Sequence, residues 1–149
     1  MSRYVIGIDP GVSTGFAIYD SHLDKFESIN TITFWSAYLF LCDWDPVAHP
    51  LKAIVIEVPD TNRVWQPSKG NVGSVQRTAV NVGRVLRESE LLARGLELLQ
   101  IGKVVKVNPR GKTSQETFVK LTGWEGGKLN QHCRDAAMLC YRWRGRNVA

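Results

Sequence analysis

The stretch that decides the fold is YVIGIDPGVSTGFAI, residues 4–18. An apolar, β-branched run ends in Asp9, turns through Pro10-Gly11 and a second glycine, and then returns to apolar residues. This pattern predicts a hairpin whose first strand is buried. A charge at the end of a buried strand is costly unless something pairs with it. Asp before Pro-Gly also often begins a turn, so a purely local role for Asp9 stays open at this point.

A second apolar run, AIVIEVP at residues 53–59, carries one acid near its C-terminal end. Its length and its β-branched residues predict a strand. Glu57 is unusual there, because Glu is depleted from strands and is rarely buried without a partner. An edge strand with Glu57 facing water is the alternative. The uninterrupted Ile-Val-Ile run favours a buried strand with a functional acid.

The third segment is NQHCRDAAMLCY, residues 130–141, whose Ala, Met and Leu content predicts a helix that begins near His132. Residues three apart share a helix face, so His132 and Asp135 can point at one spot. Taken alone, Asp135 could be a first-turn acid favoured by the helix dipole, with His132 as a polar neighbour of the cap.

Asp9, Glu57 and the His132/Asp135 pair all stand at the ends of predicted buried elements. Carboxylates gathered in one place repel one another, and a divalent cation is the usual way to keep them ionised together. Oxygen ligands with one imidazole suit Mg²⁺ or Mn²⁺. The chain has no paired Cys or His spacing, which disfavours structural zinc. Two such ions would activate water and stabilise a leaving oxygen in phosphodiester hydrolysis.

In this order, the three segments resemble the RuvC-type Holliday-junction resolvases of the RNase H-like superfamily. The resemblance runs from Tyr4 to about Tyr141 and is strongest in GIDPG, residues 7–11, and in HCRDAA, residues 132–137. It implies an α/β, RNase H-like fold with a five-stranded mixed sheet and flanking helices, in one nuclease domain over residues 1–149. By position, it assigns both metal binding and catalysis to Asp9, Glu57, His132 and Asp135.

The resemblance also implies a function. Members of the family are Mg²⁺-dependent homodimers that nick two opposed strands of a four-way DNA junction, with two ions expected in each active site. Two alternatives remain open. One is an RNase H-like nuclease that acts on other branched or single-stranded nucleic acid, because fold alone does not set the substrate. The other is a DNA-structure binder without catalysis.

Composition agrees with this interpretation. The 149 residues suit one domain, and 44% hydrophobic with 22% charged residues is typical of an ordinary globular protein. A net charge of +5 fits a polyanionic partner, although only weakly. Three cysteines without a spaced motif suggest reduced, mostly buried thiols in a cytoplasmic protein of a bacterial cell or a phage-infected host. The apolar runs are too short to span a bilayer, so no membrane association is expected.

The pattern of apolar runs and breakers predicts nine elements. Strands are expected near 3–9, 15–20, 26–34, 52–58 and 103–108, and helices near 36–42, 74–100, 113–121 and 131–143. Three consecutive strands before the first helix predict a sheet that starts antiparallel.

Basic and aromatic residues near the expected site are candidates for nucleic-acid binding. The long polar stretch 59–73 follows Glu57 directly and suits base stacking and phosphate contact. Trp65 could instead cover the core, and the cations could belong to a solvated surface. The candidates are Arg63, Trp65 and Lys69 in this stretch, Arg77 and Arg84 on the next helix, and Arg110 and Lys112 after the fifth strand.

Overall fold

The computed structural model describes residues 1–59 and 72–146. Arg63, Trp65 and Lys69 lie outside the described residues, so the roles expected for them stay predictions. The nine expected elements are all present close to their expected bounds.

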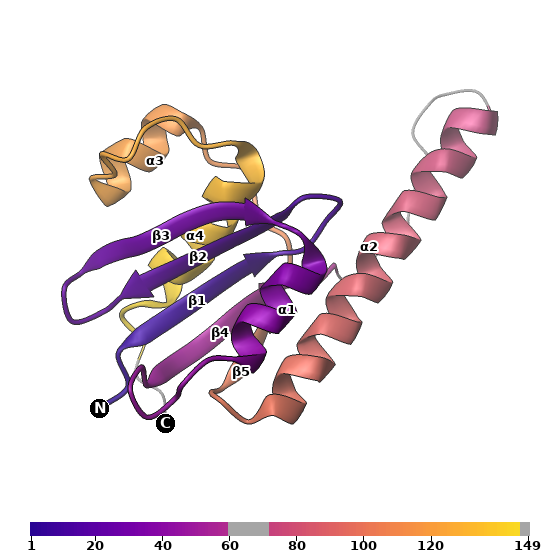
Figure 1. Cartoon of the computed structure of the whole chain (residues 1–149). Coiled ribbons are helices and arrows are strands. Elements are labelled where there is room, and N and C mark those ends of the chain that lie inside the picture. Colours follow the sequence, from indigo (N-terminus) through magenta and orange to yellow (C-terminus); the bar gives the residue numbers. More distant parts are fainter. Residues whose placement is uncertain (60–71, 147–149) are drawn as a thin grey trace.

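Five strands form one mixed sheet in the order β3-β2-β1-β4-β5, as predicted (Figure 1). β1 is antiparallel to β2, and β2 is antiparallel to β3, which gives the expected antiparallel start. β4 is parallel to both β1 and β5. The strands are β1 (Tyr4–Asp9), β2 (Thr14–Asp20), β3 (Lys25–Ile32), β4 (Leu51–Glu57) and β5 (Val104–Val107).

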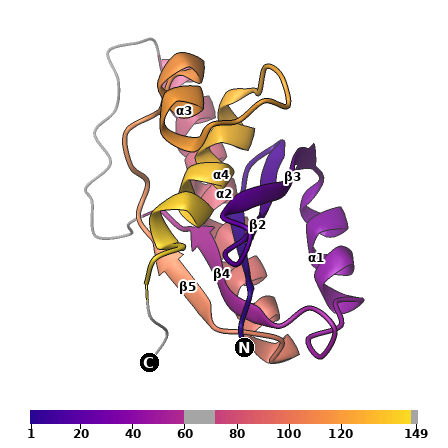
Figure 2. The ribbon, with the colours of Figure 1, turned by 90° about the vertical axis from the view of Figure 1, so that its left-hand side faces the viewer.

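Helices cover both faces of the sheet. α1 (Phe34–Cys42) and α2 (Val72–Leu99) lie on one face, and α4 (Gln131–Trp143) lies on the other, with α3 (Gln115–Thr122) beside it. Figure 2 shows this layering, with α3 and α4 on one side of the strands and α1 on the opposite side. Because both faces are covered, the central residues of β1 and β4 are apolar on both faces rather than alternating, and the charged residues are Lys52 near the start of β4 and the terminal Asp9 and Glu57.

Alternate residues of β1 and β4 supply two separate cores. Ile6 and Ile54 are fully buried against α1 and α2, whereas Val5 and Val55 are buried against α4. β4 lies between β1 and β5, so the edge-strand alternative for Glu57 is wrong.

The remaining sequence predictions concern cysteines and membranes. All three cysteines are free thiols, with Cys133 and Cys140 buried and Cys42 exposed. Among the helices in the described parts of the chain, none has the length and apolar character that crossing a bilayer would require.

Candidate active site

The candidate site lies where β1 and β4 end. Asp9 is the last residue of β1 and Glu57 is the last residue of β4. Because these strands are parallel neighbours, their carboxyl ends meet at the same edge of the sheet. The sequence pattern of one acid at the end of each apolar run therefore predicted this placement correctly.

Two glycines allow α4 to approach this edge closely. A Cβ atom at Gly7 would lie 2.1 Å from the carbonyl oxygen of Ala136, and one at Gly15 would lie 2.0 Å from that of His132. Both distances are far below van der Waals contact, so any larger residue would push α4 away from the sheet. The close approach brings the first turns of α4, which carry His132 and Asp135, to the ends of the strands.

The N-terminus of α4 is fixed by its own cap. The side-chain oxygen of Asn130 accepts a hydrogen bond from the backbone N–H of Cys133 at 2.9 Å, and its Nδ2 donates to Oγ1 of Thr31 on β3 at 2.7 Å. Asn130 thus satisfies a free N–H of the first turn. His132 is consequently not needed for capping, and its ring is available for other contacts.

Arg134 ties the beginning of α4 to the segment before α3. Its Nε donates to the carbonyl oxygen of Thr113 at 2.9 Å, and its Nη2 donates to Oε1 of Gln131 at 2.9 Å. A further guanidinium nitrogen donates to the carbonyl oxygen of Leu129. These bonds hold the start of α4 against the loop that precedes it.

His132 and Asp9 are in direct contact. Nδ1 of His132 lies 3.0 Å from Oδ2 of Asp9. A carboxylate can only accept, so Nδ1 is the donor and Nε2 is left free to take a proton. The Asp9 side chain is 8% exposed, whereas that of His132 is 48% exposed. Asp9 therefore contacts another element, and its role is more than a local turn contact.

Asp9 and Glu57 both have raised pKa values, and the charge of Asp135 contributes to each. Burial, together with the nearby charges of Asp9 and Asp135, raises the pKa of Glu57 to about 7, against the opposing effect of Arg142. Burial also raises the pKa of Asp9, although the hydrogen bond from His132 works against this and the charge of Asp135 adds to it. Mutual repulsion of this kind is what a bound cation would relieve.

The donor set fits a hard divalent cation, because it consists of three carboxylates and one imidazole. Within residues 1–59 and 72–146, no group of three or more His, Cys, Asp or Glu side chains has the geometry to hold a metal ion as it stands. Asp135 is one reason for this, because its Oδ1 already accepts a hydrogen bond from Nε2 of Gln131 at 2.6 Å. Joint coordination requires these side chains to rotate toward one another.

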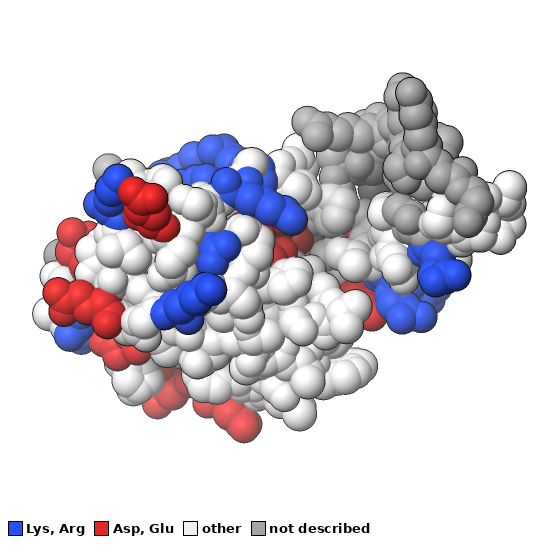
Figure 3. Space-filling view, turned by 90° about the horizontal axis from the view of Figure 1, so that it is seen from above, with Lys and Arg blue, Asp and Glu red and all other residues white. Residues whose placement is uncertain are grey.

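The described cations expected to bind nucleic acid lie on two sides of the site. Arg110 lines a small cavity with Glu57 and Asp135, and the charge of Lys112 lowers the pKa of Asp9. Arg77 is exposed on α2, and Arg84 faces a groove bordered by the loop after β1. Figure 3 shows Lys and Arg gathered on both sides of a hollow, one group over α2, with acidic side chains in between.

Sequence reasoning missed Arg142 as a site residue, although it falls within the helix expected at 131–143. The structure places it on α4, where it lines the same cavity as Glu57 and Asp135. The available signal was its spacing, because residues seven apart lie on one face of a helix.

Comparisons with known proteins give a match in structure alone. No family model matches the sequence, and no curated protein matches it either. The structure of Thermus thermophilus RuvC in complex with a Holliday junction substrate matches with a TM-score of 0.55 and 13% identity, over 93% of this chain and 90% of that one. A second T. thermophilus RuvC structure gives a TM-score of 0.50 and 13% identity, over 92% and 90%.

A Fowlpox virus resolvase in complex with substrate Holliday junction DNA matches with a TM-score of 0.49 and 12% identity, over 95% of this chain and 96% of that one. The two RuvC matches cover nearly the whole of both chains. The protein therefore has the RuvC-like, RNase H-like fold that the motifs predicted.

Proposed function

We propose that this chain is a single-domain, metal-dependent endonuclease that resolves four-way DNA junctions by paired, symmetric nicks. One observation carries the proposal: Asp9, Glu57 and Asp135 converge at one end of a RuvC-like sheet, closely enough that the charge of Asp135 adds to the raised pKa of both Asp9 and Glu57. Structural neighbours of known function include an enzyme bound to a Holliday junction. At 13% identity that likeness supports the fold, and the site residues of this chain supply the chemical argument.

The four site residues would hold Mg²⁺, with Mn²⁺ as a substitute. Asp9 would serve both ions, Glu57 would hold one of them, and His132 with Asp135 would complete the set of ligands. Bound divalent ions lower the pKa of a coordinated water and stabilise charge on the phosphate and the leaving oxygen. The products expected from the resemblance carry 5′-phosphate and 3′-hydroxyl ends.

The protein's own residues orient this chemistry. Burial and the N–H of His132 hold the Asp9 carboxylate in one position. The same hydrogen bond leaves Nε2 as the one free ring nitrogen of His132, which would act either as a metal ligand or as a proton acceptor for water. Arg77 and Arg84 on α2, and Arg110 and Lys112 across the hollow, would contact the DNA backbone.

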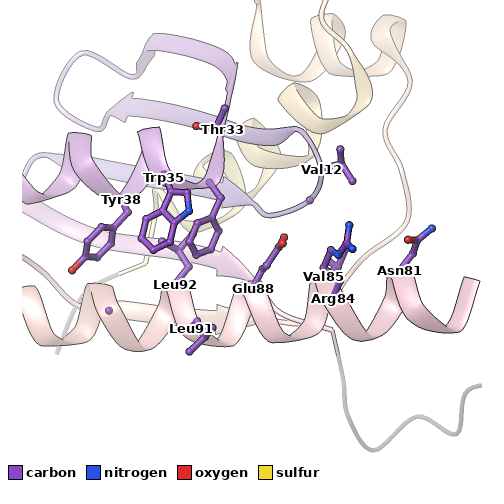
Figure 4. Close-up of a pocket in the computed structure, with 13 residues that line it drawn as sticks. Val12, Thr33, Trp35, Tyr38, Asn81, Arg84, Val85, Glu88, Leu91 and Leu92 are labelled. Carbon is purple, nitrogen blue, oxygen red and sulfur yellow. The ribbon is translucent and has the colours of Figure 1, made fainter. Parts of the chain in front are cut away.

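Two symmetric cuts need two active sites, so we propose a C2 homodimer. Its support is an apolar face formed by exposed side chains of α1 and α2, among them Trp35 at 67% and Leu98 at 77% exposure. Trp35 and Tyr38 of α1, and Arg84, Glu88 and Leu92 of α2, border a groove of about 690 Å³ (Figure 4). Monomers rarely leave such an area of apolar surface uncovered.

A second copy of the chain suits this face, because the face is self-complementary. Leu91 stands between the groove described above and a second one that contains Arg94. Packing two α2 helices antiparallel, with the two-fold axis beside Leu91, would place Glu88 opposite Arg94 of the partner subunit. The row of side chains on each α2 would then pack into a groove of the other copy, and the negative Glu88 of each copy would face the positive Arg94 of the partner subunit.

Nicking of labelled four-way junctions with and without Mg²⁺ tests the proposed function. The proposal predicts paired nicks that require the ion. Cleavage of single-stranded or other branched DNA in preference to the junction would indicate a nuclease with another substrate. Tight junction binding without cleavage under any divalent ion would indicate a DNA-structure binder.

A further inference from the structure

A small cavity lies between the end of β4, the segment after β5 and α4. Its charged wall consists of two acids, Glu57 and Asp135, and two bases, Arg110 and Arg142. Its volume is about 10 Å³, far too small for a base or a sugar. Any ligand of these side chains must therefore lie at the mouth of the cavity.

The two arginines come from different elements but face one site. Arg142 follows Asp135 by seven residues on α4, so the two residues share a helix face about 10 Å apart along the axis. Arg110 belongs to the segment that connects β5 to α3. The charge of Arg142 reaches Glu57, whose pKa it lowers against the effect of burial.

Both guanidinium groups are uncommitted, although other arginines in or next to α4 are bonded or stacked. In the part of the chain that the structure describes, Arg110 and Arg142 are exposed and take part in no ion pair or hydrogen bond. Arg134, by contrast, bonds to four neighbouring residues, and Arg144 lies over the Tyr141 ring. Arg110 and Arg142 therefore do not stabilise the described part of the fold through ion pairs or hydrogen bonds.

Free guanidinium groups beside a carboxylate cluster have a clear chemical use. The acids would repel an approaching phosphodiester, and a guanidinium binds phosphate oxygens through two parallel N–H donors. We infer that Arg110 and Arg142 bind the non-bridging oxygens of the phosphate that is cut, so that Arg142 is a catalytic residue. This inference rests on the proposed function and extends it to residues outside the metal-binding set.

Single-turnover cleavage of a four-way junction tests Arg142 directly. The variant Arg142→Gln should cut on the order of 100-fold more slowly, as expected when one donor to developing charge is removed. Its affinity for the junction should change by less than about 3-fold, since the loss is one contact among many. Arg142→Lys should recover part of the rate, because it keeps the charge without the fork.

The matched control is Lys25→Gln, which also removes one positive charge. Lys25 lies at the β2–β3 turn, at the opposite end of the sheet from Asp9, and should leave cleavage unchanged. Wild-type cleavage by Arg142→Gln would overturn the inference. Full recovery of the Arg142→Gln rate at higher pH would also overturn it, since Arg142 would then act only through the ionisation of Glu57.

A metal-free measurement separates this inference from the proposed function. Titration with inorganic phosphate should shift the Nε–H NMR signals of Arg110 and Arg142, and Arg142→Gln should weaken the response of Arg110. Unmoved signals would contradict the phosphate site even if the protein cuts junctions. Shifted signals in a protein that cuts no DNA would support the site while refuting the nuclease.

Discussion

Nδ1 of His132 lies 3.0 Å from Oδ2 of Asp9, and this hydrogen bond joins α4 to β1 across most of the chain. The contact fixes a buried carboxylate and leaves Nε2 of the ring free on a half-exposed side chain. It therefore links the two ends of the sequence at the atoms that the proposed chemistry needs.

His132 should contribute less than the carboxylates, and its contribution should depend on what replaces it. We expect His132→Ala to lower single-turnover cleavage by about 100-fold, because the ring nitrogen that would serve as metal ligand or proton acceptor is lost. His132→Asp should keep measurable activity, since a carboxylate can still bind the ion. Equal, wild-type rates in both variants would limit His132 to a structural role.

The stability of the metal-free protein should fall as pH rises from about 4.5 to about 7. The pKa of Glu57 is raised from 4.5 to about 7 in the folded chain, so the folded state holds this proton more tightly than the unfolded state. Deprotonation in this window therefore favours unfolding.

Glu57→Gln removes that titration. Chemical denaturation in EDTA at pH 8 should show a higher free energy of unfolding for Glu57→Gln than for wild type, by about 1–3 kcal/mol. Mg²⁺ should bind the wild type more tightly as pH rises toward 7, because the ion needs the ionised carboxyl. Parallel stability profiles for the two proteins between pH 4.5 and pH 7 would contradict the raised pKa of Glu57.

Glycine at position 15 should be required for the placement of α4. Gly15→Ala would put a Cβ atom 2.0 Å from the carbonyl oxygen of His132 and should lower the free energy of unfolding by about 1–3 kcal/mol. Gly83→Ala is the matched control, because Gly83 lies in α2 with nothing within 4 Å of an added Cβ. This variant should gain about 0.5–1 kcal/mol. Equal denaturation midpoints would show that α4 can shift at no cost.

The apolar face of α1 and α2 should hold two copies together. Leu91→Glu should convert the dimer to a monomer in analytical ultracentrifugation, because each charge would be buried at the proposed two-fold axis. Leu121→Glu, at a similarly exposed leucine on α3, should stay dimeric. Exchanging the charges of Glu88 and Arg94 tests the proposed contact between the two copies. Glu88→Arg and Arg94→Glu should each weaken the dimer, and the double variant should restore it.

The parts of the fold that follow from local patterns were predictable. β1 and β4 read as buried strands because both their faces are covered, and Asp9 and Glu57 stood out as charges in those runs. The sequence did not reveal the exposed apolar face of α1 and α2, because the exposure of these side chains depends on how α2 is positioned relative to the sheet. It also did not reveal that Gly7 and Gly15 allow α4 to pack closely against the sheet, since the α4 residues that they contact are more than 100 positions away in the sequence.

The candidate site was predictable to the same extent. Asp9, Glu57, His132 and Asp135 mark the ends of their elements and meet at one edge of the sheet. Arg142 was missed because an arginine near the end of a helix is usually solvated, and only the packing of α4 shows that it faces the site. Trp65 lies in the stretch outside the described residues, and its expected role in stacking on an open junction stays a prediction.

The most direct test of the central claim is cleavage of a labelled four-way junction by the wild type and by Asp9→Asn, Glu57→Gln and Asp135→Asn, each with Mg²⁺ and with EDTA. Junction binding is measured in parallel. The account predicts paired nicks by the wild type in Mg²⁺ alone, no cleavage by the three variants, and retained binding in all of them. Cleavage at wild-type rate by any two of these variants, or by the wild type in EDTA, would contradict it.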